Sequence, residues 1–104
     1  MYKLEEASLN INTDSLCEFL ERVSLLFSVG FGRSEITQIT SLAIRMEIDN
    51  EQELALAVEH AGQHSVLKIR LFKDDLEEID LYFFALPELA AILQIEIAKY
   101  IESD

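Results

Sequence analysis

The sequence predicts a single α+β domain spanning residues 1–104, in which helices form a second layer on one face of an antiparallel sheet. Two segments have the apolar periodicity and the start signals of helices, and several others alternate between apolar and polar residues. Only one proline and three glycines interrupt the chain. The elements should therefore be long and the connections short. The expected architecture is a two-layer sandwich, a meander of three to four strands with a helix before it and a helix after it, in the order (β)αββββα.

The first elements are an extended segment and a helix. Residues 1–11 are expected to form a strand, although Glu5, Glu6 and Ala7 interrupt its alternation. The apolar positions that follow have helical spacing; they are Leu16, Phe19, Leu20, Val23, Leu26 and Phe27. Ser15 and Glu18 have the spacing of a capping box, with Thr13 or Asp14 as alternative caps. Gly30 or Gly32 is expected to stop the helix.

Three later segments have the period of half-buried strands. In residues 36–48, Leu42, Ile44, Met46 and Ile48 alternate with Ser41, Ala43, Arg45 and Glu47. The same pattern occurs in residues 66–72 and 79–85. Alternation of this kind predicts strands with one buried face. Residues 73–77 are expected to form the hairpin connection between the last two strands.

Residues 50–61 fit two interpretations. As a strand, Leu54, Leu56 and Val58 alternate with polar or small residues, and the chain then turns at residues 61–63. As a helix, Asn50 would be the cap and Glu53 would complete a capping box. The uninterrupted two-residue period favours the strand. The helix would change the order to βαβαββα.

The last helix is expected to begin at Pro87, which the first helical turn tolerates, followed by Glu88 at the positive end of the helix dipole. Its apolar stripe consists of Leu89, Leu93, Ile97, Tyr100 and Ile101. Ile92 and Ile95 lie outside that stripe, so the helix is either packed on two sides or forms a homodimer contact. The alternation of Leu93, Ile95 and Ile97 leaves a short strand as an alternative.

If both helices pack on one side of the sheet, the other side is open to solvent or to a partner. The residues expected there are Arg45, Glu47, Glu59, Lys68, Arg70, Asp80, Tyr82 and Phe84.

The composition limits the classes of partner. Twenty acidic residues oppose eight basic ones, which gives a net charge of -12. Such a charge repels nucleic-acid backbones and anionic lipid surfaces, so we expect neither direct nucleic-acid binding nor membrane binding. No apolar run reaches the roughly 18 residues of a membrane helix, and residues 1–6 lack the basic head of a secretion signal. A single cysteine, Cys17, cannot form an intramolecular disulfide, and we expect a cytoplasmic protein.

Catalytic and metal-binding patterns are weak. His60 and His64 are four residues apart, but no third metal ligand lies nearby in the sequence. The acidic neighbours of Cys17 oppose formation of a thiolate. The glycines of residues 30–34 lack the spacing of a nucleotide-binding loop. We therefore expect no enzyme activity, no cofactor and no metal site.

The acidic residues are concentrated in two short runs. The first run is Glu47, Asp49, Glu51 and Glu53, and the second is Asp74, Asp75, Glu77, Glu78 and Asp80. In a four-stranded meander the turns at 49–52 and 74–77 would lie at the same end of the sheet, about 10 Å apart, which is two strand spacings. The runs would then merge into one acidic rim. The alternative is that they are ordinary solvated turns, whose charges discourage aggregation between sheets.

An acidic rim beside an open face with Tyr82 and Phe84 has the composition of a protein-binding surface, since aromatic residues anchor and charges steer. The predicted function is a non-enzymatic interaction domain that neutralises or docks to a basic protein partner. Immunity proteins, inhibitors of nuclease toxins and acidic mimics of nucleic acid have a comparable size and charge. The alternative is a small oligomeric accessory protein that dimerises through Ile92 and Ile95.

Overall fold

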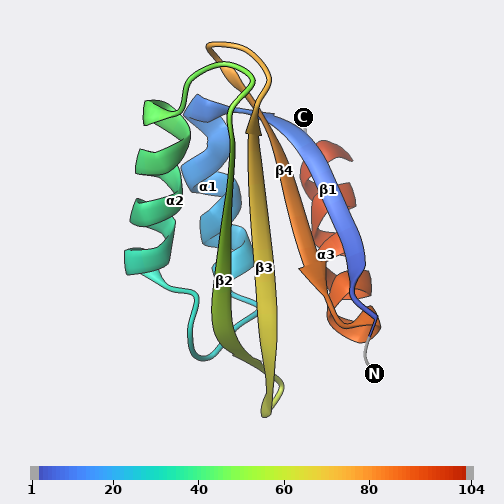
Figure 1. Cartoon of the computed structure of the whole chain (residues 1–104). Coiled ribbons are helices and arrows are strands. Elements are labelled where there is room, and N and C mark those ends of the chain that lie inside the picture. Colours follow the sequence, from blue (N-terminus) through green and yellow to red (C-terminus); the bar gives the residue numbers. More distant parts are fainter. Residues whose placement is uncertain (1–2, 103–104) are drawn as a thin grey trace.

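The computed structural model describes residues 3–102, which form one four-stranded sheet and three helices (Figure 1). In chain order the elements are β1 (Glu5–Asn12), α1 (Thr13–Ser24), α2 (Arg33–Arg45), β2 (Glu51–His60), β3 (Gln63–Lys73), β4 (Glu78–Ala85) and α3 (Pro87–Glu102). The predicted α+β class is confirmed. The expected strand at 1–11 is β1, and its first two residues lie outside the described part of the chain.

The sheet is antiparallel throughout, in the order β1-β4-β3-β2. Strands β2, β3 and β4 form a meander, and β1 joins its far edge by pairing with β4. The strand interpretation of residues 50–61 is therefore confirmed, with Glu51 opposite Phe72 and His60 opposite Gln63. The predicted hairpin connection is confirmed at residues 74–77, while Lys73 still belongs to β3, and the helix that starts at Pro87 is also confirmed.

The strand predicted at residues 36–48 is wrong, because this segment contains α2. Its buried residues, Ile36, Ile39 and Ala43, follow a helical spacing. Ile44, which the alternation would place on the buried face with Leu42 and Met46, is 68% exposed. The helix begins at Gly32, whose backbone N–H donates to the Glu35 carboxylate at 2.7 Å. The element order is therefore βααβββα, and β1 supplies the fourth strand.

The start and the end of α1 also differ from the expectation. The cap is Asn12, whose side-chain oxygen accepts the backbone N–H of Asp14 at 2.8 Å. No loop separates β1 from α1, so the cap is the last residue of the strand. The helix ends at Ser24, before either glycine. Gly30 instead lies in the loop to α2, and Gly32 caps the start of α2.

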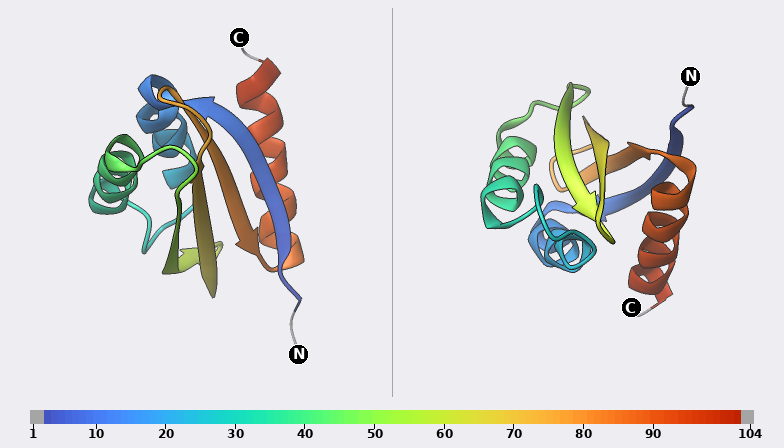
Figure 2. Two further views of the ribbon diagram at one scale, coloured as in Figure 1. Left: turned by 45° about the horizontal axis from the view of Figure 1, so that its top comes forward. Right: turned by 90° about the horizontal axis from the view of Figure 1, so that it is seen from below.

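All three helices lie on one side of the sheet (Figure 2). Alternate residues of the strands face these helices and are buried, among them Leu9, Ile69, Leu81 and Phe83. α1 contributes the fully buried Phe19, and α2 packs mainly against α1. No helix of residues 3–102 covers the opposite face of the sheet, as the two-layer prediction required.

Candidate protein-binding surface

The uncovered face of the sheet, called here the open face, carries the strand residues that point away from the helices. Cross-strand pairs place Arg70 beside Tyr82, Lys68 beside Phe84 and Glu53 beside Arg70. Of the residues predicted for this face, Glu59, Lys68, Arg70, Asp80, Tyr82 and Phe84 lie on it. Arg45 and Glu47 do not, because Arg45 ends α2 and Glu47 lies in the loop after it.

Tyr82 and Phe84 form a stacked pair at the centre of the open face. Their ring centroids are 6.4 Å apart and the rings are inclined by 14°. The guanidinium carbon of Arg70 lies 5.0 Å from the centroid of Phe84, within the range of a cation–π contact. The two rings are half-buried, so they offer apolar surface that is partly covered by the cation of the same chain.

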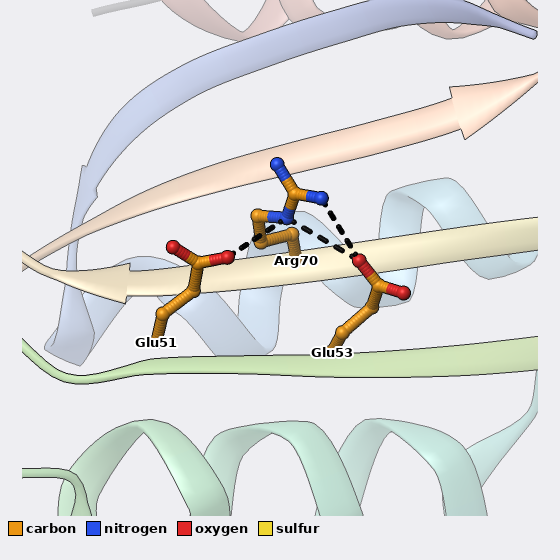
Figure 3. A network of polar contacts seen from close by, with 3 residues as sticks. All are labelled: Glu51, Glu53 and Arg70. Atoms are coloured by element: carbon orange, nitrogen blue, oxygen red, sulfur yellow. Dashed lines mark hydrogen bonds and ion pairs between the residues drawn. The ribbon is translucent and has the colours of Figure 1, made fainter.

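Arg70 is held by two glutamates of the first acidic run (Figure 3). Its Nε lies 3.1 Å from Glu51 Oε1, and its Nη2 lies 3.0 Å from Glu53 Oε2. All three side chains are about half exposed, so each ion pair contributes little to stability. The pairs nevertheless neutralise charge locally. Glu51 and Glu53 are therefore two predicted site residues whose negative charge is balanced by a basic side chain of the same chain. Asp80, further along the face, accepts a hydrogen bond from Asn10 Nδ2 at 2.8 Å.

The acidic residues of the two runs that lie outside the strands meet at one end of the sheet, in the loop 46–50 and the turn 74–77. The backbone N–H of Asp49 donates to the carbonyl oxygen of Lys73 at 2.9 Å, and the N–H of Lys73 donates to Asn50 at 3.0 Å. The two segments are thus neighbours, one strand spacing apart where we expected two, because α2 and not another strand precedes β2, so the loop 46–50 continues along the edge of β3. We call this region the acidic end, and it comprises Glu47, Asp49, Asp74, Asp75 and Glu77.

All five residues of the acidic end are exposed, and within residues 3–102 none of them forms an ion pair. Two of them stabilise local structure. Asp75 Oδ1 accepts the backbone N–H groups of Glu77 and Glu78 at 2.8 and 2.9 Å, which fixes the turn. Asp49 has a φ of 67°, a left-handed conformation that aspartate tolerates better than most residues. Glu78, at the start of β4, is half-buried.

Lys73 lies beneath the acidic end and supports it structurally, a role that the sequence pattern did not predict. Its side chain is 3% exposed, and its Nζ donates to the carbonyl oxygen of Ala43 at 2.7 Å. Ala43 lies in the last turn of α2, where carbonyl groups lack helical partners and the dipole favours a cation. Lys73 thus joins α2 to the sheet. Burial of alternate β3 residues from Leu67 onward was the signal that could have placed it inside.

The side chains considered for chemistry lie apart from one another. Cys17 is exposed on α1, and its Sγ lies 3.5 Å from Glu21 Oε1. The hydrogen bond to Glu21 raises the pKa of the Cys17 thiol, with desolvation and the charge of Glu21 acting in the same direction. His60 Nδ1 bonds to the carbonyl oxygen of Leu26, and His64 lies 3.2 Å from Glu59. Within residues 3–102 no group of three metal-ligating side chains is close enough together to hold an ion.

The predicted dimer contact involves two differently placed residues of α3. Ile92 is half-buried and lines a cavity of about 530 Å³ between the start of α3 and the β2–β3 hairpin. Ile95 is 56% exposed. No helix among the described residues is long and apolar enough to cross a membrane.

No protein-family model, curated protein or solved structure matches the chain. The open face and the acidic end differ in how their charges are compensated. On the open face, Arg70 forms ion pairs with Glu51 and Glu53, whereas the acidic end lacks a cation partner among the described residues.

Proposed function

We propose that this protein is a non-enzymatic binding domain whose partner is a basic protein. The observation that supports this proposal is the acidic end, where five exposed carboxylates lie on two adjacent segments without an ion pair among residues 3–102. Uncompensated charges of one sign create a potential that attracts and orients a partner of the opposite sign. An inhibitor of a nuclease-type toxin and an acidic mimic of nucleic acid are both functions with such a partner.

The open face adds contact area to this proposal. It extends from the acidic end through Glu78 and Asp80 to the stacked rings of Tyr82 and Phe84. Half-buried aromatic rings are frequent anchors in protein interfaces, because they bury much apolar area at little cost in side-chain entropy. A partner that covered both regions would combine charge attraction with apolar burial.

The test is a pull-down from the native host with two variants of equal charge. The first, Glu47→Gln with Asp74→Asn and Glu77→Gln, neutralises the acidic end. The control, Glu5→Gln with Glu21→Gln and Glu88→Gln, removes the same charge outside both regions, at the starts of β1 and α3 and on the exposed side of α1.

The wild-type protein and the control should retain a basic partner at about 50 mM NaCl and release it at about 500 mM, because salt screens exposed charges. The acidic-end variant should bind it at least about tenfold more weakly. Failure to recover any salt-sensitive basic protein, or equal loss in both variants, would contradict the proposed function.

A second candidate function, a small oligomeric accessory protein, is supported by α3. Ile95 and Ile101 are 56% and 58% exposed on this helix. Light scattering on a size-exclusion column tests the candidate directly. A dimer that dissociates on Ile95→Ser would support it, and a monomer at about 100 μM would remove it.

A further inference from the structure

Three of the large aliphatic side chains that are exposed to solvent belong to segments that meet at the acidic end. Ile44, in the last turn of α2, is 68% exposed, Ile48 in the loop 46–50 is 48% exposed, and Leu76 in the turn 74–77 is 78% exposed. Figure 1 shows this loop and this turn side by side beyond the ends of β2 and β3, next to the end of α2.

Lys73 joins the three segments. Its Nζ bonds to Ala43, the residue before Ile44, and its carbonyl oxygen accepts the N–H of Asp49, the residue after Ile48. Leu76 follows Lys73 by three residues in the turn that Asp75 fixes. The backbone that presents the aliphatic side chains is therefore held in place by buried or local hydrogen bonds, although the side chains themselves are open to water.

Two of these aliphatic residues have an acidic residue on each side in the sequence. Ile48 lies between Glu47 and Asp49, and Leu76 lies between Asp75 and Glu77. Exposed apolar side chains on neighbouring segments, with a charged border, are typical of a contact surface, whereas single scattered ones need no explanation. The negative border selects the partner, because it attracts lysine and arginine and repels phosphate groups and a second acidic end.

We propose that the acidic end, with Ile44, Ile48 and Leu76 as apolar anchors, is the docking site for a basic amphipathic segment of another protein. The segment would place aliphatic or aromatic side chains on the three anchors and lysine or arginine opposite the carboxylates. The inference rests on the proposed function and makes it more specific. It adds anchors at the acidic end itself, where no cation of the chain's described part covers them, whereas the Arg70 cation already covers part of Phe84 on the open face.

The experiment uses a synthetic 18-residue helix-forming peptide of leucine and lysine as its probe, together with a peptide of equal charge in which serine replaces leucine. Binding is measured by isothermal titration calorimetry at about 50 mM NaCl. The test variant is Ile48→Ser with Leu76→Ser. The control is Leu25→Ser, because Leu25 is 85% exposed but follows the C-terminal end of α1. Since α1 starts at the acidic end, where Thr13 N–H donates to the Glu77 carbonyl at 2.7 Å, its twelve residues place Leu25 about 18 Å away.

The leucine peptide should bind the wild-type protein and Leu25→Ser equally well, and the double variant at least about tenfold more weakly. The serine peptide should bind weakly to all three proteins. Circular dichroism should show the same fold in each protein, since the replaced side chains are exposed. Leu76→Asn alone is a second test variant, and it should also bind the leucine peptide more weakly than the wild-type protein does.

The alternative outcomes separate the inference from the proposed function. Equal affinity for the two peptides, or a loss on Tyr82→Ala but not on Ile48→Ser with Leu76→Ser, would overturn the inference while a charge-dependent function stands. Recovery of a salt-sensitive basic partner that Ile48→Ser with Leu76→Ser still binds normally would likewise overturn the inference and leave the proposed function standing. If no basic partner is recovered and neither peptide binds, both fail.

Discussion

Gly30 and Gly62 both have positive φ angles, 90° and 80°, but only Gly30 lies against another segment of the chain. A Cβ atom on Gly30 would lie 1.9 Å from the carbonyl oxygen of Ala57, whereas one on Gly62 would meet nothing within 4 Å. This close approach lets the loop before α2 pair with β2, through hydrogen bonds of Ser28 and Val29 with Glu59. The requirement at Gly30 is therefore space as well as backbone conformation.

Gly30→Ala should destabilise the protein much more than Gly62→Ala. At Gly62 alanine meets only the conformational penalty of about 1–2 kcal/mol. At Gly30 the loop must also move away from β2 and lose its hydrogen bonds, so we expect a loss of about 3 kcal/mol or more in the free energy of unfolding. Urea denaturation of the two variants measures the difference. Equal losses would mean that the loop adjusts without leaving β2.

At the residue scale the sequence showed which groups are chemically notable but not their environments. The acidic neighbourhood of Cys17 was readable, and the raised pKa of its thiol agrees with it. The alternation of Leu67, Ile69 and Leu71 extends to residue 73, but the burial of Lys73 was not predicted, because a lysine next to Asp74 and Asp75 is typical of a solvated turn. Its position depends on the end of α2 lying over β3, which is a tertiary contact.

At the element scale, residues 33–45 show why a short alternation cannot decide between helix and strand. Leu42, Ile44, Met46 and Ile48 repeat every second residue, but Ile36, Ile39 and Ala43 repeat at helical spacing in nearly the same stretch. The start signal at Gly32 and Glu35 decides between them, because the Glu35 side chain accepts the Gly32 N–H. β3 and β4 were predictable, since each had a single period. β2 and α3 were predicted correctly although both also fitted the other period, because an uninterrupted alternation favoured the strand and the start signal at Pro87 favoured the helix.

The cap of α1 gives an element-scale prediction. Asn12→Ala should lower the free energy of unfolding by about 1 kcal/mol, because the Asp14 N–H loses its side-chain acceptor. Asn12→Ser should retain most of the stability, since serine also supplies a capping oxygen. Ser15→Ala is the control, because Ser15 lies inside the first turn and caps nothing. A larger loss at Ser15 than at Asn12, measured by urea denaturation, would restore the capping box expected from the sequence.

At the scale of the whole molecule, the meeting of the two acidic segments was predictable although the element before β2 was not. The start of β2 and the end of β3 lie at the same end of an antiparallel pair whether a helix or a strand precedes them. What the sequence could not show is the division of the acidic runs. Glu51, Glu53, Glu78 and Asp80 lie on the open face, where Arg70 contacts Glu51 and Glu53 and Asn10 contacts Asp80. The other five residues of the two runs remain at the acidic end.

The net charge of -12 should make stability depend on salt, and the dependence should be concentrated at the acidic end. Folding brings like charges together, and NaCl reduces their repulsion as the Debye length falls from about 30 Å at 10 mM to about 10 Å at 0.1 M. We expect the urea midpoint of the wild-type protein to rise between 10 and about 300 mM NaCl, by an amount equivalent to roughly 1 kcal/mol. Glu47→Gln with Asp74→Asn and Glu77→Gln should reduce this rise more than Glu5→Gln with Glu21→Gln and Glu88→Gln. The opposing effect is the attraction between these carboxylates and the buried Lys73, which salt would weaken. A midpoint that falls with added NaCl would mean that this attraction, and not repulsion, dominates at the acidic end.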